Sequence, residues 1–295
     1  MRISLLARVT AAASLFTLPV IFLPAQAQTQ TPTKTEQTRP DGDGGGYGKY
    51  AIPKNPPSRP TPRTPDGKPD LSGVWGGPSG LQNIGRELPG TLLPYTDAGR
   101  AAYQYNLTKA IDPSALCIIQ GVPRADLSGQ PFEIFQRPGR VAILYERDTS
   151  WRIIAADGRQ HPKEPEPSFF GDSVGTWDGD TFVVDSIGFK GDKIWADETA
   201  HAQSDQLHLI ERFSRPDFDH LQAEVTIDDP KYYTAPFKFT RKFRLLPYEL
   251  IEQACDENNI DRTHIGVGLG TKDGTRGYDK NAPKPGAQGP SASNQ

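Results

Sequence analysis

Long apolar runs, basic clusters and metal-ligand spacings are missing from most of this sequence. After the N-terminal segment 1–28, no stretch approaches the ~20 apolar residues that a membrane-spanning helix needs. The formal net charge is −3 with no basic cluster, which argues against a nucleic-acid or anionic membrane partner. The chain has two cysteines, and neither a Cys-x-x-Cys motif nor a Cys–His cluster is present. We therefore expect no metal, no cofactor and no thiol redox chemistry.

The N-terminus has the layout of a secretory signal peptide. Arg2 and Arg8 precede an apolar stretch that ends in the small-residue pattern Ala-Gln-Ala at residues 25–27, which predicts cleavage after the second of these alanines. A membrane anchor is the alternative, but Pro19 and Pro24 interrupt the apolar stretch and disfavour it. The sequence therefore predicts a periplasmic or secreted protein without a membrane span.

Composition divides the rest of the chain into one domain and two flanks. Residues 28–68 are rich in Pro, Gly, Thr and charge, and residues 269–295 have a similar composition. Such segments bury too little apolar surface to offset chain entropy, so we expect a linker and a disordered tail. The remaining residues, 69–268, have the length of a single domain.

Short segments rich in β-branched and aromatic residues predict that this domain is all-β. The segments are 139–146, 151–157, 180–187, 206–213, 220–228 and 237–246. Turn-forming residues separate them, and the only helix that we expect before the strands covers residues 95–106, with Thr96 as its cap. The fold class predicted is an antiparallel up-and-down barrel, with a β-sandwich as the alternative.

One turn can be predicted in detail. Asp178 and Gly179 form the preferred pair of a two-residue hairpin turn. We therefore expect residues 176–177 to pair with residues 180–181.

Two resemblances add to this interpretation. The segment "DLSGVW" at 70–75 resembles the Gly-x-Trp signature that opens lipocalin and other calycin barrels. The segments "WDGDTFVVD", "IERFSR" and "TIDDPKYYTAPF" resemble a widespread group of exported bacterial proteins of uncharacterised function, over roughly residues 112–259. The first resemblance implies an up-and-down barrel with an apolar cavity for a small molecule, and the second implies no function.

The two cysteines, Cys117 and Cys255, are an even number in a chain predicted to be exported. In an oxidising compartment an even count favours a disulfide. Two separate buried thiols are the alternative.

A strand predicted over residues 206–213 carries an acid where an apolar residue is expected. Leu207, Leu209 and Phe213 share one face by the period of two, and Glu211 lies in phase with them. A bulge near Ile210 would instead turn Glu211 outward.

The strand predicted over 237–246 repeats this pattern with a base, because Arg241 lies in phase with Phe239 and Phe243. An isolated buried charge is costly, so we expect Glu211 and Arg241 to face the interior together, from next-nearest strands. Two interpretations remain open. The pair is either a buried salt bridge that stabilises the barrel, or part of a cavity wall that contacts a polar group of a ligand.

Loops at a barrel mouth are where ligand-contacting groups collect. His161 and His201 lie in predicted loops near acidic residues, and Tyr233 precedes a strand, so we place these three at the rim. Ser204 and Asp205 follow His201, but polar residues within one loop are not a catalytic triad.

The sequence favours an exported barrel that binds a partly apolar small molecule with a polar or charged group. One alternative is a lyase, isomerase or hydrolase that uses the same pocket, with Glu211 or His201 as general base. Another is a structural module of the cell envelope. The predicted ligand-contacting residues are Arg241, Glu211, His161, Tyr233, Phe239 and Phe243.

Processing and redox state give the first prediction. We expect the exported protein to begin at Gln28 and to contain one disulfide between Cys117 and Cys255. Intact-mass analysis before and after alkylation measures both properties. Two freely alkylated thiols in denatured, non-reduced protein would contradict the disulfide.

Overall fold

The computed structural model describes residues 59–77, 83–86, 88, 93–255 and 257. The predicted signal peptide, most of the predicted linker and the predicted tail lie outside these residues. None of the helices in the described part of the chain is long and apolar enough to cross a bilayer.

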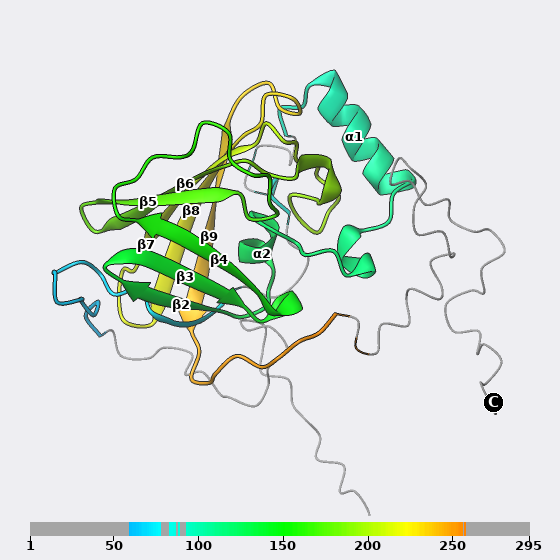
Figure 1. Ribbon diagram of the computed structural model, residues 1–295. Coiled ribbons are helices and arrows are strands. Elements are labelled where there is room, and N and C mark those ends of the chain that lie inside the picture. The colour runs from blue at the N-terminus through cyan, green and yellow to red at the C-terminus, as the bar shows by residue number, and fades with distance from the viewer. Residues whose placement is uncertain (1–58, 78–82, 87, 89–92, 256, 258–295) are drawn as a thin grey trace, which may run out of the picture. The chain divides into compact units, whose positions relative to one another are not determined.

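The described residues form a closed barrel in which the strands follow one another in sequence order (Figure 1). This result confirms the predicted all-β barrel and rules out the sandwich. The strands are β1 (Gly73–Gly76), β2 (Phe132–Arg137), β3 (Gly139–Tyr145), β4 (Ser150–Ala156), β5 (Asp172–Asp178), β6 (Thr181–Ile187), β7 (His208–Ser214), β8 (His220–Asp228) and β9 (Phe237–Leu245).

Closure with nine strands imposes one irregularity. Strands that alternate in direction around a closed barrel can all be antiparallel only if their number is even. The exception here is the pair β4 and β5, which are parallel and share a single register position, Ala155 with Val174. The connection 157–171 returns along the barrel between them. Because few backbone hydrogen bonds can form there, we call this pair of strands the β4–β5 seam.

Alternation of side chains between interior and exterior explains why the predicted strands form. In β8 every second residue is buried, as the period of two requires. Three strands were not predicted in full: β1, β2 and the first half of β5. Strand β1 has only four residues, β2 mixes apolar and charged residues, and β5 contains Gly175, against which the ring of Phe182 packs.

The predicted hairpin turn is wrong by one residue. Asp178 pairs with Thr181 and Trp177 with Phe182, so Gly179 and Asp180 are the turn residues. Gly179 has φ +60°, and a two-residue turn with Gly first requires such a positive angle.

Helical segments gather at one end of the barrel (Figure 1). Helix α1 (Asp97–Thr108) begins after Thr96, whose side chain accepts a hydrogen bond from Gly99 N, as predicted. The short segments are η2 (Pro113–Leu116), α2 (Arg124–Leu127), η3 (Arg147–Thr149) and η4 (Gly191–Lys193). We call the end that carries α1, α2 and the connections 188–207 and 229–236 the α end.

The opposite end is held by the segment that enters β1. The Arg215 guanidinium donates to Asp70 O (2.5 Å) and Ser72 O (3.2 Å) and lies 4.8 Å from the centroid of the buried Trp75 ring. Arg63 forms a two-pronged ion pair with Asp180 in the β5–β6 turn. Residues 59–68, which lie within the predicted linker, are therefore bonded to the barrel.

The predicted disulfide between Cys117 and Cys255 is present, with Cα atoms 5.4 Å apart. It joins the C-terminal end of η2 to the segment that follows β9, across a sequence separation of 138 residues. The disulfide therefore holds the segment after β9 covalently against η2.

Candidate functional site

Glu211 faces the barrel interior, as predicted, and is 0% exposed. Its ion-pair partner is Arg152 on β4, with Arg152 Nη2 and Glu211 Oε2 2.5 Å apart. The predicted pairing with Arg241 is wrong. Arg241 instead donates to Thr240 O (3.0 Å) and Asn83 O (3.3 Å).

Register explains why Arg241 does not reach Glu211. Strands β7 and β9 are next-nearest neighbours as expected, but Glu211 is aligned through Val225 with Phe239. Arg241 is aligned through Ala223 with Phe213, two positions away along the strand. The guanidinium that reaches Glu211 comes from β4, three strands away in the direction opposite to β9.

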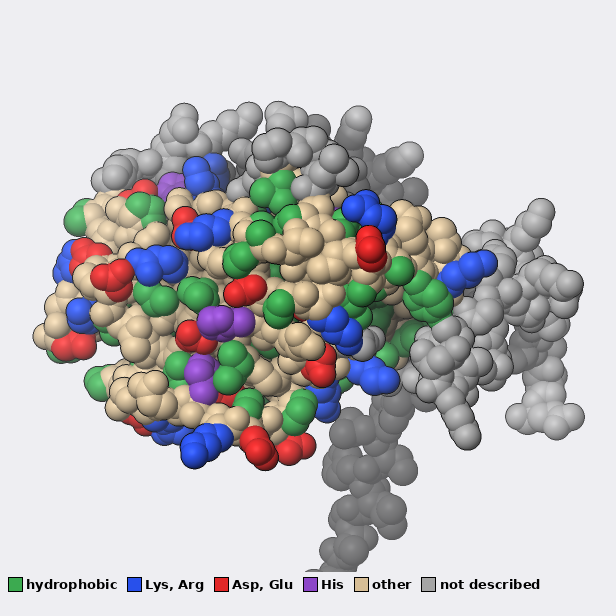
Figure 2. All heavy atoms as spheres, turned by 90° about the horizontal axis from the view of Figure 1, so that it is seen from above, with side chains coloured by type: hydrophobic (Ala, Val, Ile, Leu, Met, Phe, Trp, Pro, Cys, Tyr) green, Lys and Arg blue, Asp and Glu red, His purple; other side chains and the backbone are tan. Residues whose placement is uncertain are grey.

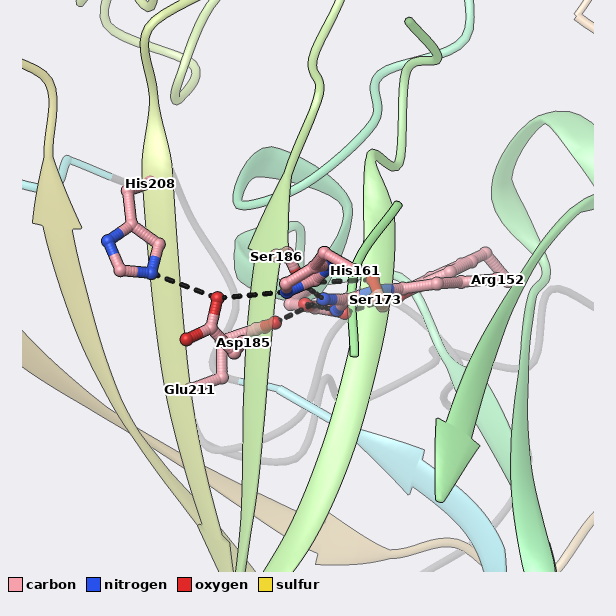
Figure 3. A network of polar contacts seen from close by, with 9 residues as sticks. Arg152, His161, Ser173, Asp185, Ser186, His208 and Glu211 are labelled. Carbon is pink, nitrogen blue, oxygen red and sulfur yellow. Dashed lines mark hydrogen bonds and ion pairs between the residues drawn. The ribbon is translucent and has the colours of Figure 1, made fainter. Parts of the chain in front are cut away.

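Arg152 is 2% exposed and makes several side-chain hydrogen bonds (Figure 3). Its Nε donates to Ser173 Oγ on β5 (3.1 Å), and its Nη2 donates to Ser186 Oγ on β6 (2.8 Å). Ser173 and Ser186 also bond to each other (2.9 Å). The guanidinium thus links β4 to β5, β6 and β7 and replaces backbone pairing that the β4–β5 seam lacks.

Helix α2 adds a second carboxyl group to this network. Asp126 accepts hydrogen bonds from Tyr145 Oη (2.6 Å) and from Arg152 Nη1 (3.4 Å). Burial raises the pKa of Asp126 well above its ordinary value, and the negative charge of Glu211 raises it further. We call this group the Arg152 cluster; its members are Asp126, Tyr145, Arg152, Ser173, Ser186 and Glu211.

The Arg152 cluster is electrically neutral when Asp126 holds its proton, because one guanidinium then faces one carboxylate. Within the described part of the chain, no N–H or hydroxyl group donates a hydrogen bond to Glu211 Oε1. However, the carboxyl group of Asp126 lies within hydrogen-bonding reach of Glu211, so a proton retained on Asp126 can fill this position. Neutrality matters because unpaired charge in an apolar interior costs several kcal/mol per ion.

A second polar group lies in the connection 188–207 at the α end. His201 is 3% exposed, so it is buried and does not lie on an exposed rim. His201 Nδ1 lies 2.5 Å from Asp197 Oδ2, and Asp197 also accepts from Ile84 N and Thr199 N, both at 2.8 Å. Burial alone would raise the pKa of Asp197, but the hydrogen bond and charge of His201 lower it below its usual value.

Aromatic rings surround His201. Its ring stacks on that of Tyr103 with centroids 4.9 Å apart and planes inclined by 6°, and Tyr95 stacks at 6.3 Å. Tyr233 stacks on Tyr95 at 5.5 Å. The Tyr233 hydroxyl donates to Ala202 O (2.8 Å), so this predicted ligand contact already has a protein partner.

Ser204 and Asp205 do not complete a triad with His201. The Ser204 hydroxyl donates to Asp229 Oδ1 (2.6 Å), and Asp205 lies 3.7 Å from Lys231 Nζ. Neither Ser204 nor Asp205 therefore bonds to the imidazole, and the hydroxyl that does, Thr199 Oγ1 at 3.0 Å, shares Nδ1 with Asp197. This arrangement argues against hydrolysis by a Ser–His mechanism.

Several buried polar atoms at the α end have no hydrogen-bond partner among the described residues. They include both amide atoms of Gln203, which is 1% exposed, and the hydroxyl of Tyr95. Buried polar groups are almost always paired, and each unpaired group costs about 1–3 kcal/mol. Nothing in the sequence marks Gln203, because a glutamine between Ala and Ser in a polar loop carries no pattern.

His161 lies on the outside of the barrel. Its ring lies between two carboxylates, with Nδ1 2.5 Å from Asp172 Oδ1 and Nε2 3.2 Å from Asp185 Oδ1. His208 also points to Asp185, at 2.9 Å (Figure 3). Figure 2 shows histidine side chains beside acidic ones on one outer face. These contacts fasten the connection 157–171 over β5 and β6.

Phe239 and Phe243 face the interior and are buried. The ring of Phe243 meets that of Phe132 edge-on, with centroids 5.1 Å apart. The predicted ligand cavity beside these two rings stays a prediction.

No protein-family description and no curated protein matches this sequence. Among solved structures, the chain is similar to a fatty acid transporter, REP1-NXSQ, with a TM-score of 0.33 and 12% identity over 61% of this chain and 98% of that chain. It is also similar to a mutant of the fluorescent protein UnaG, with a TM-score of 0.31 and 12% identity over 60% and 97% of the two chains. We assign no function from these similarities.

Loss of the Arg152 guanidinium should strongly destabilise the fold. Arg152→Met strands the buried Glu211 carboxylate, and we expect the free energy of unfolding to fall by about 3–5 kcal/mol. The double variant Arg152→Met with Glu211→Leu removes both charges and should recover most of that loss. Urea denaturation measures all three proteins. Equal stability of the wild type and the single variant would contradict the role given to Arg152.

The stability of the fold should depend on pH through the raised pKa of the buried Asp126. Its pKa is raised in the folded state, whereas an unfolded Asp titrates near ~3.9. The stabilisation from its protonated form is therefore complete below that value and is lost as the pH rises toward the folded pKa. Asp126→Asn does not titrate, so it should gain stability relative to the wild type by up to about 1.4 kcal/mol per pH unit over this window.

Urea denaturation at a series of pH values from ~4 upward tests the shift of Asp126. Asp66→Asn, which removes an exposed carboxylate, serves as the control. A stability difference between Asp126→Asn and the wild type that does not change with pH would show that Asp126 is ionised in the folded protein.

Proposed function

We propose that this protein is an exported barrel that binds a partly apolar small molecule at its α end. The observation that carries the proposal is the buried Gln203 side chain, whose amide nitrogen and oxygen both lack a partner among the described residues. A fold that leaves both atoms unpaired loses about 1–3 kcal/mol for each. A ligand that binds both atoms would recover this energy, which gives the unpaired amide a function.

The surroundings of Gln203 define the chemistry of the ligand. The amide offers an NH2 group that donates and a carbonyl oxygen that accepts, so it suits a neutral group that can both accept and donate, or two neighbouring groups of opposite kind. Tyr95 and Tyr103 present aromatic faces in the same part of the structure. An apolar row formed by Leu209, Ile227 and Phe237 closes the adjacent end of strands β7 to β9. A flat, mostly apolar molecule with one polar edge fits these features.

The Arg152 cluster supports this site without forming its main contacts. Its charges balance within the cluster, and Arg152 and Glu211 are bonded to each other. We infer that the cluster stabilises the β4–β5 seam and keeps the interior next to the ligand neutral. The charged contacts expected from Arg241 and Glu211 are therefore replaced, in this proposal, by neutral contacts from Gln203 and Tyr95.

Replacement of Gln203 by an apolar residue should separate stability from binding. Gln203→Leu removes the unpaired amide and keeps much of its volume, so we expect the ligand-free protein to become more stable by roughly 1–3 kcal/mol. The affinity for Nile red, a neutral planar dye with a carbonyl group, should fall by at least ~10-fold. Thermal unfolding and the fluorescence of the dye measure the two effects.

The matched control is Gln222→Leu, at an outward-facing position of β8. This variant should bind Nile red as tightly as the wild type. A wild-type protein that does not enhance the fluorescence of the dye, or a Gln203→Leu variant with unchanged affinity, would contradict the proposed site.

A further inference from the structure

We propose that His201 is a general base that takes a proton from the molecule bound at the α end, and that Asp197 positions it. This inference rests on the proposed function, because it requires a ligand beside the imidazole. It adds a reaction class, proton abstraction from a planar, partly apolar compound at a C–H bond next to an electron-withdrawing group.

Asp197 determines which nitrogen of His201 is basic. A carboxylate only accepts hydrogen bonds, so the 2.5 Å contact between Asp197 Oδ2 and His201 Nδ1 places the proton on Nδ1. The lone pair of the neutral imidazole is then on Nε2. Asp197 itself is held by the backbone N–H groups of Ile84 and Thr199, so its carboxylate cannot rotate away without losing these bonds.

The ring of His201 is fixed in place on its other sides. Tyr103 stacks on it at 4.9 Å with nearly parallel planes. The preceding residue, Ala200, has φ +72°, a left-handed conformation that is strained in a residue other than Gly. Asn106 Nδ2 in α1 donates to Ala200 O (3.0 Å) and helps to hold this conformation. Strained backbone of this kind often occurs where a side chain must be aimed.

His201 Nε2 has no protein partner among the described residues, whereas Nδ1 has Asp197 and Thr199. The neighbouring Tyr95 hydroxyl is also buried without a partner. Burial raises the pKa of Tyr95, with further increases from Tyr103 and Asp197, so this hydroxyl keeps its proton and remains a donor. The site thus combines an open base with an open hydrogen-bond donor.

This combination suits a definite proton transfer. His201 Nε2 accepts the proton from the substrate carbon, and the electron pair of the broken C–H bond moves into the substrate. The imidazolium that forms is opposite the Asp197 carboxylate, which stabilises its charge. Tyr95 can donate to the oxygen on which negative charge develops.

Glu211 is a poorer candidate for the base than His201. Its Oε2 is bonded to the Arg152 guanidinium at 2.5 Å, and its carboxylate charge is neutralised within the Arg152 cluster. Of the two general bases expected from the sequence, the geometry therefore favours His201 and a lyase or isomerase type of reaction.

The probe reaction is the opening of 5-nitrobenzisoxazole, a planar and mostly apolar compound. A base removes its ring C–H proton, and the electron pair of that bond forms the nitrile. The N–O bond breaks, and its electron pair stays on the oxygen as a coloured phenolate. The reaction needs no oxidant, metal or second substrate, so it reports the base alone.

We expect the wild type to open the probe at least ~10-fold faster than His201→Asn, since a positioned base contributes ~10²–10⁴-fold in natural sites. The asparagine amide can still donate to Asp197 from the position of Nδ1, so the loop keeps its bond and loses only Nε2. His220→Asn changes a histidine of the outer β8 face and should react like the wild type.

The tautomer of His201 gives a test that needs no variant. ¹⁵N spectra of the wild type should show the proton on Nδ1, and a proton on Nε2 in the neutral form would overturn the proposal. Equal probe turnover by the wild type and His201→Asn, with saturation-transfer NMR showing that both bind the probe, would remove the base and leave the binding function intact. If neither the wild type nor His201→Asn binds the probe, the proposed base is overturned. If the wild type also fails to bind Nile red, the proposed binding function is overturned too.

Discussion

Closure of an odd number of strands is the constraint on which the rest of this structure depends. Nine strands require one parallel neighbour pair, and that pair, β4 with β5, shares only one register position. Arg152 joins the two sides from within through Ser173, Ser186 and Glu211. Outside the barrel, His161 ties the connection 157–171 to β5 and β6. A charged side chain in the interior is therefore explained by a topological need.

The Arg152 cluster and the residues around His201 differ in how many of their buried polar atoms have a hydrogen-bond partner. In the Arg152 cluster, the guanidinium of Arg152 donates to both carboxyl groups and to both serine hydroxyls. Beside His201, the amide of Gln203 and the hydroxyl of Tyr95 have no partner in the described part of the chain. A satisfied buried network rigidifies a fold, whereas unpaired groups cost energy until something binds them. On this difference rests our proposal that the Arg152 cluster stabilises the fold and that the residues around His201 bind the ligand.

The local pattern of residue types along the chain was enough to predict most of the barrel. The period of two in residues 206–213, 220–228 and 237–246 predicted strands and the inward direction of Glu211, because alternation depends only on the geometry of an extended chain. The helix cap at Thr96 and the disulfide were also predicted correctly. The cap depends on residue type, and the disulfide depends on the cysteine count and the expected compartment. The predicted position of the β5–β6 turn was wrong by one residue, because two registers that differ by one residue can both place Gly179 in the turn.

Contacts between distant strands were decided by tertiary structure alone. The sequence showed that Glu211 needs a cation, but two strands separate it from Arg152. Arg152 reaches it past Ser173 on β5 and Ser186 on β6 only because the sheet curves. Likewise, a glutamine in a polar loop looks solvated until packing buries it. His201 meets Tyr103 only after α1 has packed beside the connection 188–207. Sequence patterns record which residues share a face, whereas the identity of a partner across the interior depends on curvature and register, which no local pattern encodes.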